Sequence, residues 1–240
     1  MTPSESHTER ILRHIGRYSL TIRPVLDKLF FRGVSGKSHN LIQAMLRDEL
    51  LTYHSLGKVS YYQLTKKGAL KVGLPSTRAH AVGEHLTEHL AYLWFCTLGR
   101  HQRELLDRQR LRGYFPNTNL RAAHCLQARK GARTFSVFRL RLAGTNASDS
   151  SLLKSLQGYI AQATEPSSEL NPLLRRRLYG FAILFHSHER RRRFKAAAEA
   201  KRLFTLGARS RRVNVLHQFE IVPAPETLER AIHALYKQDT

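Results

Sequence analysis

The sequence predicts a mixed α/β protein of two domains, in which three short helices and a β-hairpin precede a larger α/β domain built on a mixed sheet. Three observations lead to this fold class. Apolar residues recur at helical spacing before residue 50, two strand-like runs follow directly, and strand-like and helical segments alternate from residue 76 onward. The chain has 240 residues and is 42% hydrophobic, which is enough to bury one sizeable core or two smaller ones.

Positive charge dominates the composition. Forty Lys and Arg against eighteen Asp and Glu give a formal net charge of +22, more than solubility requires, so we expect a polyanionic partner. The longest apolar stretch, residues 90–98, is too short to span a bilayer, and the first twenty residues lack the pattern of an export signal. We therefore expect a cytoplasmic protein without a membrane partner. Cys96 and Cys125 form no CxxC pair and are expected to be free, buried thiols.

Two helices are expected before residue 35. The first covers Glu9–Tyr18, where apolar residues share one side and Ser4 or Thr8 can cap the start. The second covers Thr21–Phe31 and ends at Arg32-Gly33. Its inward residues are expected to be Val25, Leu26, Leu29 and Phe30.

A third helix is expected between Ser38 and Leu50. Its inward stripe comprises Leu41, Ile42, Met45 and Leu46. The residues left on the polar side are of the donor-rich types that contact phosphates and base edges. They are Lys37, Ser38, His39, Asn40, Gln43 and Arg47.

A β-hairpin follows, with strands at Leu51–Leu56 and Val59–Leu64 around the turn Gly57-Lys58. Three helices, a hairpin and a closing LTxxG element at residues 64–68 resemble the winged helix-turn-helix family. The resemblance implies that the third helix enters the major groove of DNA while the wing, with Lys58 and Tyr61, contacts the backbone or minor groove, and Lys66 and Lys67 hold phosphates. Such units also serve as protein–protein modules, but residues 1–75 carry a net charge of +7, which favours DNA.

The segment Leu74–Thr77 marks the expected boundary, giving domains 1–75 and 76–240. A long helix is expected at Arg78–Leu98. Three strands of one sheet are then expected at Glu104–Leu111, Leu120–Gln127 and Phe135–Leu142.

The remaining elements alternate between helix and strand. A helix is expected at Ser151–Ala163, followed by a fully apolar and hence central strand at Phe181–Phe185. A long basic helix at His188–Phe204, a strand at Val213–Val222 and a helix at Pro225–Tyr236 complete the order.

This topology resembles the restriction-endonuclease-like core. Combined with the preceding winged helix and the segment FAILFHSHERRRRFKAAAEAKRLF, the chain resembles the replication-relaxation family of plasmids and integrative elements. The resemblance spans most of the chain through moderately specific motifs. It implies a DNA-binding accessory or initiator protein of a mobile element, acting in plasmid replication, mobilisation or transcriptional control.

A nuclease of this fold holds Mg²⁺ through acidic residues on its second and third strands. Between Arg108 and Ser148 there is no Asp or Glu, and Arg121, Arg139 and Arg141 stand about where carboxylates are needed. Because arginine cannot ligate a divalent cation, we expect a non-catalytic scaffold that uses no cofactor or metal. The acidic candidates under another strand register are Glu84, Glu88, Glu104 and Asp107. The pattern His85-x-x-Glu88-His89 matches a zinc-peptidase motif but lacks a distal acidic ligand.

Three arginine clusters complete the candidate sites. They are Arg175, Arg176 and Arg177; Arg190, Arg191, Arg192 and Arg193; and Arg211 with Arg212. Consecutive arginines without interleaved acids repel one another, so phosphate binding is favoured over a solvated face or a surface for an acidic protein.

The sequence therefore predicts a duplex-DNA-binding protein whose winged helix sets sequence preference and whose arginine clusters bind phosphates. A metal-dependent endonuclease or nickase, and an adaptor that bridges a relaxase or replication initiator to DNA, stay open as alternatives. RNA is a lesser one, because no aromatic stacking motif is visible. A homodimer is also expected.

Overall fold

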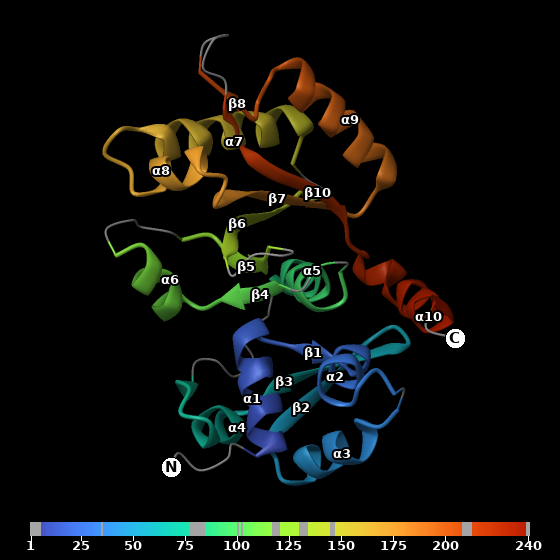
Figure 1. The fold of residues 1–240 in the computed structure, drawn as a ribbon. Coiled ribbons are helices and arrows are strands. Elements are labelled where there is room, and N and C mark those ends of the chain that lie inside the picture. Colours follow the sequence, from blue (N-terminus) through green and yellow to red (C-terminus); the bar gives the residue numbers. More distant parts are fainter. Residues whose placement is uncertain are drawn as a thin grey trace. The chain divides into compact units, whose positions relative to one another are not determined.

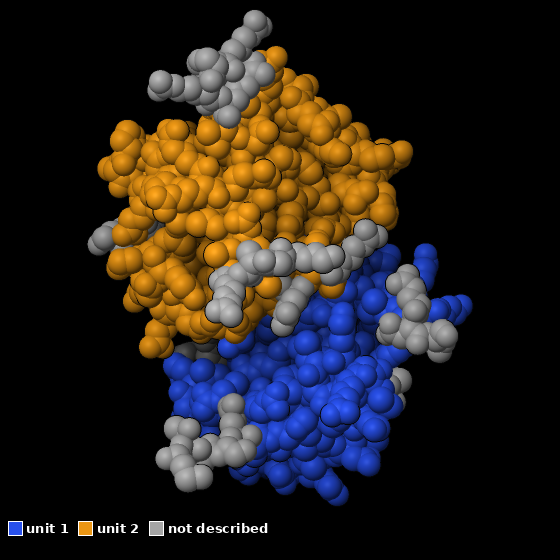
Figure 2. All heavy atoms as spheres, in the orientation of Figure 1, with its two compact units in different colours: residues 1–98, 223–240 blue, residues 99–222 orange. Residues whose placement is uncertain are grey.

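The computed structural model describes residues 6–34, 36–76, 85–99, 101, 103–116, 121–129, 134–144, 147–207 and 213–238. The chain forms two compact units, which Figure 2 colours separately. The first combines Met1–Leu98 with Pro223–Thr240, and the second is Gly99–Val222. This division differs from the expected boundary after residue 75, because a helix beyond it and the C-terminal helix both join the N-terminal unit. None of the described helices is long and apolar enough to cross a membrane.

The first unit opens with α1 (His7–Tyr18). Ser6 is its N-cap: the Ser6 hydroxyl accepts from the Glu9 backbone N–H at 3.2 Å, and the Glu9 carboxylate accepts from the Ser6 N–H at 2.9 Å. This reciprocal pair satisfies two backbone donors that the helix itself leaves free. Thr8 was therefore the wrong choice of cap, since it already lies inside the helix, and Ser4 is outside the described residues.

A three-stranded antiparallel sheet packs in the same unit (Figure 1). The elements that follow α1 are β1 (Thr21–Ile22), α2 (Arg23–Phe30), α3 (His39–Arg47), β2 (Leu51–Leu56), β3 (Val59–Leu64) and α4 (Lys66–Lys71), and the strand order is β1-β3-β2. Both hairpin strands have the expected bounds, and Gly57 supplies the positive φ of +60° at the turn. The helix expected from Thr21 begins two residues later, because Thr21 and Ile22 pair with β3.

The core of this unit lies between the helices and the sheet, and includes Ile11, Leu12, Ile15, Leu26, Ile42, Met45 and Leu64. Leu29, expected to face inward, is 44% exposed because the buried part of α2 is confined to Val25, Leu26 and Asp27. Three further elements belong to the unit: α5 (Leu86–Thr97), a 3-10 turn (Pro225–Thr227) and α10 (Leu228–Gln238). Residues 78–84 of the long helix expected before Leu98 lie outside the described residues.

The second unit is built on a five-stranded mixed sheet. Its elements are β4 (Arg103–Leu106), α6 (Arg108–Tyr114), β5 (His124–Ala128), β6 (Phe135–Leu142), α7 (Asp149–Thr164), α8 (Leu170–Arg175), β7 (Tyr179–Phe185), α9 (His188–Ala200), β8 (Thr205–Leu206), β9 (Val213–Asn214) and β10 (Leu216–Ile221). The order is β10-β7-β6-β5-β4. β4, β5 and β6 run antiparallel, whereas β6, β7 and β10 run parallel, so the expected mixed sheet is confirmed.

Helices α7, α8 and α9 cover one face of this sheet (Figure 1). β7 is buried along its whole length, as its apolar run indicates, and its alternate residues Tyr179, Phe181, Ile183 and Phe185 enter the core beneath the helices. This face also receives Arg139 and Arg141 of β6, because Arg139 pairs with Phe181 and Arg141 with Ile183 across the ladder.

Several expected elements of this unit were wrong in their bounds. The strand expected at Glu104–Leu111 ends at Leu106, because the Asp107 side chain accepts from the Arg110 backbone N–H at 2.8 Å and starts α6. Helix α9 ends at Ala200 rather than Phe204, and Arg202 follows in the left-handed conformation. The strand expected at Val213–Val222 is divided into β9 and β10, and α8 was not expected.

Candidate nucleic-acid interface

The turn that leads into α3 is organised by Asp27. This carboxylate is 1% exposed and accepts the backbone N–H groups of Gly36 and Ser38, each at 3.0 Å. The hydroxyl of Tyr236 on α10 lies 3.5 Å from the same carboxylate. Asp27 thus fixes the start of α3 relative to α2. Sequence reasoning missed this role, although an Asp within the apolar stripe of a short helix is a usable signal.

The polar side of α3 is exposed as its periodicity predicts. His39, Asn40, Gln43 and Arg47 are exposed, as is Lys37 just before the helix, whereas Ile42 and Met45 are each 1% exposed. The Arg23 guanidinium at the start of α2 lies 3.3 Å from Nδ1 of His39, which adds a cation to this surface. Donor side chains from α2 and α3 therefore face solvent together.

Ser38 is a correction to the predicted contact set. It is fully buried, its N–H is bonded to Asp27, and its hydroxyl has no hydrogen-bond partner among the described residues. A side chain in this position cannot reach a nucleic acid.

The turn of the β2–β3 hairpin presents Lys58, whose side chain is 83% exposed and whose Nζ lies 3.7 Å from Glu229 of α10. Tyr61 is half-buried and stacks on His54, with ring centres 5.0 Å apart. Lys66 and Lys67 of α4 are exposed, and the Lys67 ammonium lies 3.7 Å from Glu49. Ion pairs this exposed contribute at most about 1 kcal/mol to stability, so Lys58 and Lys67 can exchange their carboxylate partners for another anion.

A pocket of about 290 Å³ lies beside this hairpin. Residues of α2, of the hairpin and of α10 line it, among them Arg23, Lys58, Tyr62, Glu229 and Tyr236. The C-terminal helix therefore forms one wall of the surface next to the hairpin.

The predicted arginines of the second unit occupy different environments. Arg121, Arg175, Arg176 and Arg177 are exposed. Arg139 is half-buried, with its central guanidinium carbon 3.6 Å from the ring centre of Tyr159, and Arg141 is exposed two residues along β6. Arg211 and Arg212 lie outside the described residues.

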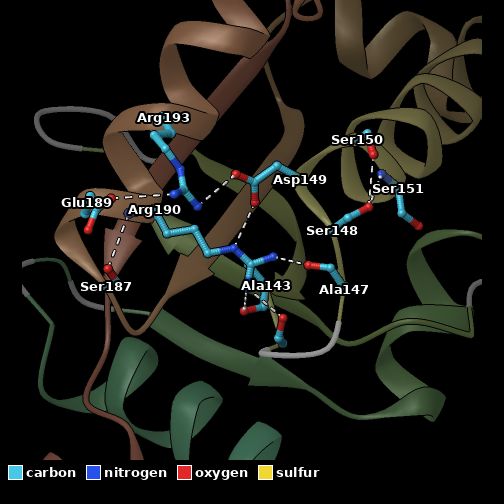
Figure 3. Close-up of polar contacts among 11 residues, drawn as sticks. Ala143, Ala147, Ser148, Asp149, Ser150, Ser151, Ser187, Glu189, Arg190 and Arg193 are labelled. Atoms are coloured by element: carbon cyan, nitrogen blue, oxygen red, sulfur yellow. Dashed lines mark hydrogen bonds and ion pairs between the residues drawn. The ribbon is translucent and has the colours of Figure 1, made fainter.

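The four consecutive arginines on α9 have different environments, and Figure 3 shows two of them, Arg190 and Arg193. Arg190 points inward and holds the loop between β6 and α7. Its Nε donates to Asp149 at 2.8 Å, and its terminal nitrogens donate to the carbonyl oxygens of Ala143 at 3.1 Å, Gly144 at 2.7 Å and Ala147. Arg190 was therefore wrongly placed among the phosphate-binding residues, because its guanidinium is occupied within the protein.

The other three arginines of the run remain accessible. Arg191 is half-buried and Arg192 is exposed. Arg193 lies 3.6 Å from Asp149 and 3.5 Å from Glu189, with 64% of its side chain exposed.

The acidic candidates for metal chemistry are engaged elsewhere. Glu104 forms an ion pair with Arg110 at 2.6 Å, Asp107 caps α6, and Glu88 accepts from the Tyr92 hydroxyl and lies 3.8 Å from His85. Within the described parts of the chain, no three His, Cys, Asp or Glu residues are grouped to hold a metal ion. Glu84 lies outside them.

No protein-family model, curated protein or solved structure matches this chain.

Proposed function

We propose that this chain is a duplex-DNA-binding protein that reads its site through a winged helix-turn-helix. The observation that carries the proposal is the exposed donor face of α3, with His39, Asn40, Gln43 and Arg47, on a unit that also presents a hairpin with Lys58 at its turn. Asn and Gln side chains pair with adenine edges, and Arg and Lys pair with guanine or phosphate, so this face has the chemistry that major-groove readout requires.

The net charge supports the same assignment. A charge of +22 favours a polyanion, and a duplex offers regularly spaced phosphates whose released counterions drive binding. In this proposal α3 supplies sequence preference, whereas the exposed cations Lys66, Lys67 and Arg192 add affinity that depends on salt.

We assign the second unit to a restriction-endonuclease-like core that has no catalytic role. Three antiparallel strands followed by a parallel strand that is reached through α7 support this assignment. Arg139 and Arg141 lie on β6, about where such a nuclease would need carboxylates. The proposed role is that of an accessory protein of a mobile element, acting on plasmid DNA in replication, mobilisation or transcriptional control.

The experiment begins by sequencing DNA fragments retained by the purified protein at several salt concentrations, which identifies the preferred site. Affinities for that site and for a scrambled duplex are then compared by fluorescence anisotropy. The double variant Asn40→Ala, Gln43→Ala should lose about tenfold or more of the preference, because each lost base contact is worth about 1–3 kcal/mol.

Two variants separate the roles of α3 and of the phosphate contacts. Arg192→Gln should weaken both duplexes equally and lower the salt slope by about one unit. Gln162→Ala, an exposed position on α7, is the matched control and should change neither affinity. A protein that ignores every duplex in dilute buffer would refute the proposal. Equal losses on both duplexes for the α3 variant would refute its part in sequence preference.

A further inference from the structure

Two arginines share the helix-covered face of β6. Arg139 pairs with His124 of β5 on one side and with Phe181 of β7 on the other, while Arg141 pairs with Ile183. Residues two apart on a strand point to the same face and lie roughly 7 Å apart. The two guanidinium groups can therefore reach one small anion.

Tyr159 of α7 orients this pair. The Arg139 guanidinium carbon lies 3.6 Å from the centre of the Tyr159 ring, which is the stacked cation–π arrangement. A hydrogen bond from Ser155 lowers the pKa of Tyr159, and the positive charges of Arg139 and Arg141 lower it further. Both arginines thus act on the same phenol. The stack restrains the Arg139 side chain, which also forms hydrogen bonds with the Tyr159 and Tyr179 phenols. Because a guanidinium carries five N–H donors, donors remain for an anion.

The positive charge of this pair is not offset within the described residues. Neither Arg139 nor Arg141 forms an ion pair with a carboxylate there. Glu104, on the same face, is paired with Arg110 at 2.6 Å, and Asp149, at the start of α7, with Arg190 at 2.8 Å.

The neighbouring polar groups also fail to supply a negative charge. His124 is bonded through Nε2 to the Tyr179 hydroxyl at 2.9 Å, and burial lowers the pKa of His124 to about 4, with Arg139 acting in the same direction. Burial raises the pKa of the Tyr179 phenol, so this hydroxyl stays neutral. A half-buried arginine beside neutral partners is best stabilised by an anion.

We propose that Arg139 and Arg141 form a binding site for a single phosphate group on the second unit. Arg139 is held by its stack on the face of the Tyr159 ring, and Arg141 closes the site from the exposed side. The phosphate is that of a nucleic acid, either an internal phosphodiester or a terminal phosphomonoester. Only this choice of source rests on the proposed DNA-binding function, because the site itself is argued from charge and geometry.

The test follows the side-chain Nε–Hε resonances of the arginines by NMR during titration of the full chain. The three probes are inorganic phosphate, a dinucleotide with only an internal phosphodiester, and the same dinucleotide with a 5′-phosphate. We expect saturable shifts of the Arg139 signal and a rise in the pKa of Tyr159 on binding. Saturation by the internal phosphodiester assigns the site to the DNA backbone. Saturation by the phosphomonoesters alone assigns it to a terminal phosphate.

Arg141→Gln is the decisive variant because Arg141 is exposed and its loss leaves the core intact. It should weaken phosphate binding about tenfold or more, since a charge-assisted contact is lost. Arg129→Gln removes the same charge just beyond β5, where strand alternation directs the side chain to the opposite face, and should leave binding within about twofold. Arg139→Lys keeps the charge but loses the planar stack, and should bind more weakly than the parent.

Equal effects of Arg141→Gln and Arg129→Gln, or no saturable shift of the Arg139 signal with any probe, would overturn the site. The Asn40→Ala, Gln43→Ala protein should retain the parent affinity for the phosphate probes. A chain that binds these probes but ignores duplexes would therefore refute only the proposed function, and a chain that reads duplexes without binding the probes would refute only this site.

Discussion

Replacing Arg190 by Ala should destabilise the second unit by about 3 kcal/mol. The side chain is 17% exposed and makes one ion pair with Asp149 and three hydrogen bonds to the carbonyl oxygens of Ala143, Gly144 and Ala147. Hydrogen bonds to charged groups contribute about 1.5–3 kcal/mol each, and removing one partner of a buried pair costs about 3–5 kcal/mol. The expected loss lies at the lower end of the range for a buried pair, because Asp149 is 25% exposed and water can replace some of the hydrogen bonds that Arg190 makes.

Urea unfolding followed by far-ultraviolet circular dichroism measures this loss. Arg192→Ala is the matched control, because it removes the same side chain from the same helix at an exposed position and should change stability by no more than about 0.5 kcal/mol. Hydrogen exchange should also be faster in the backbone around Ala143 in the Arg190 variant. Equal stabilities of the two variants would refute the conclusion that the hydrogen bonds of Arg190 stabilise the β6–α7 loop.

The remaining predictions concern stability and the α2–α3 turn. Burial lowers the pKa of His124 to about 4 from its ordinary 6.5, so the unfolded chain binds more protons at this residue between these values. His124 should therefore contribute a loss of about 3 kcal/mol of stability as pH drops from 6.5 to 4. His124→Gln should remove this contribution in urea titrations and leave that of His14, whose pKa burial lowers to about 3. Gly68→Ala should destabilise the protein by about 2–3 kcal/mol in thermal unfolding, because the new Cβ would lie 2.1 Å from the Leu50 carbonyl oxygen. Gly158→Ala, at an exposed position on α7, is the control and should stabilise the protein by about 0.5–1 kcal/mol. The reverse order of stabilities would contradict the packing around Gly68. Asp27→Ala should release the turn before α3 and weaken DNA binding about tenfold or more, since two buried N–H groups lose their acceptor; unchanged anisotropy would show that the turn holds without it.

Local sequence patterns were sufficient to predict the bounds of the hairpin strands and the exposed polar side of α3. Gly57 adopts a positive φ between two alternating runs, so the bounds of β2 and β3 followed from turn chemistry. Asn40 and Gln43 were placed outward by helical spacing, which depends only on neighbours along the chain.

Features that depend on distant segments were not predictable in the same way. Arg190 and Arg192 stand in one run of identical residues, and only the position of a loop some forty residues earlier decides that Arg190 turns inward. Ser38 is of a residue type that often contacts DNA, but it is buried because its backbone N–H donates a hydrogen bond to the buried Asp27 carboxylate. Asp107 ends a strand and starts a helix in a segment where leucines and charged residues are mixed, and periodicity alone does not decide between strand and helix there.

The first unit is discontinuous along the chain, and this sets an order for its assembly during translation. The ribosome releases α1 to α5 first and α10 only after the whole of Gly99–Val222 has been made. Until then Asp27 lacks the nearby Tyr236 hydroxyl, and Lys58 lacks Glu229. A nascent chain therefore carries an incomplete first unit for most of its synthesis, and a fragment cut after residue 98 would lack α10 and preserve that incomplete state.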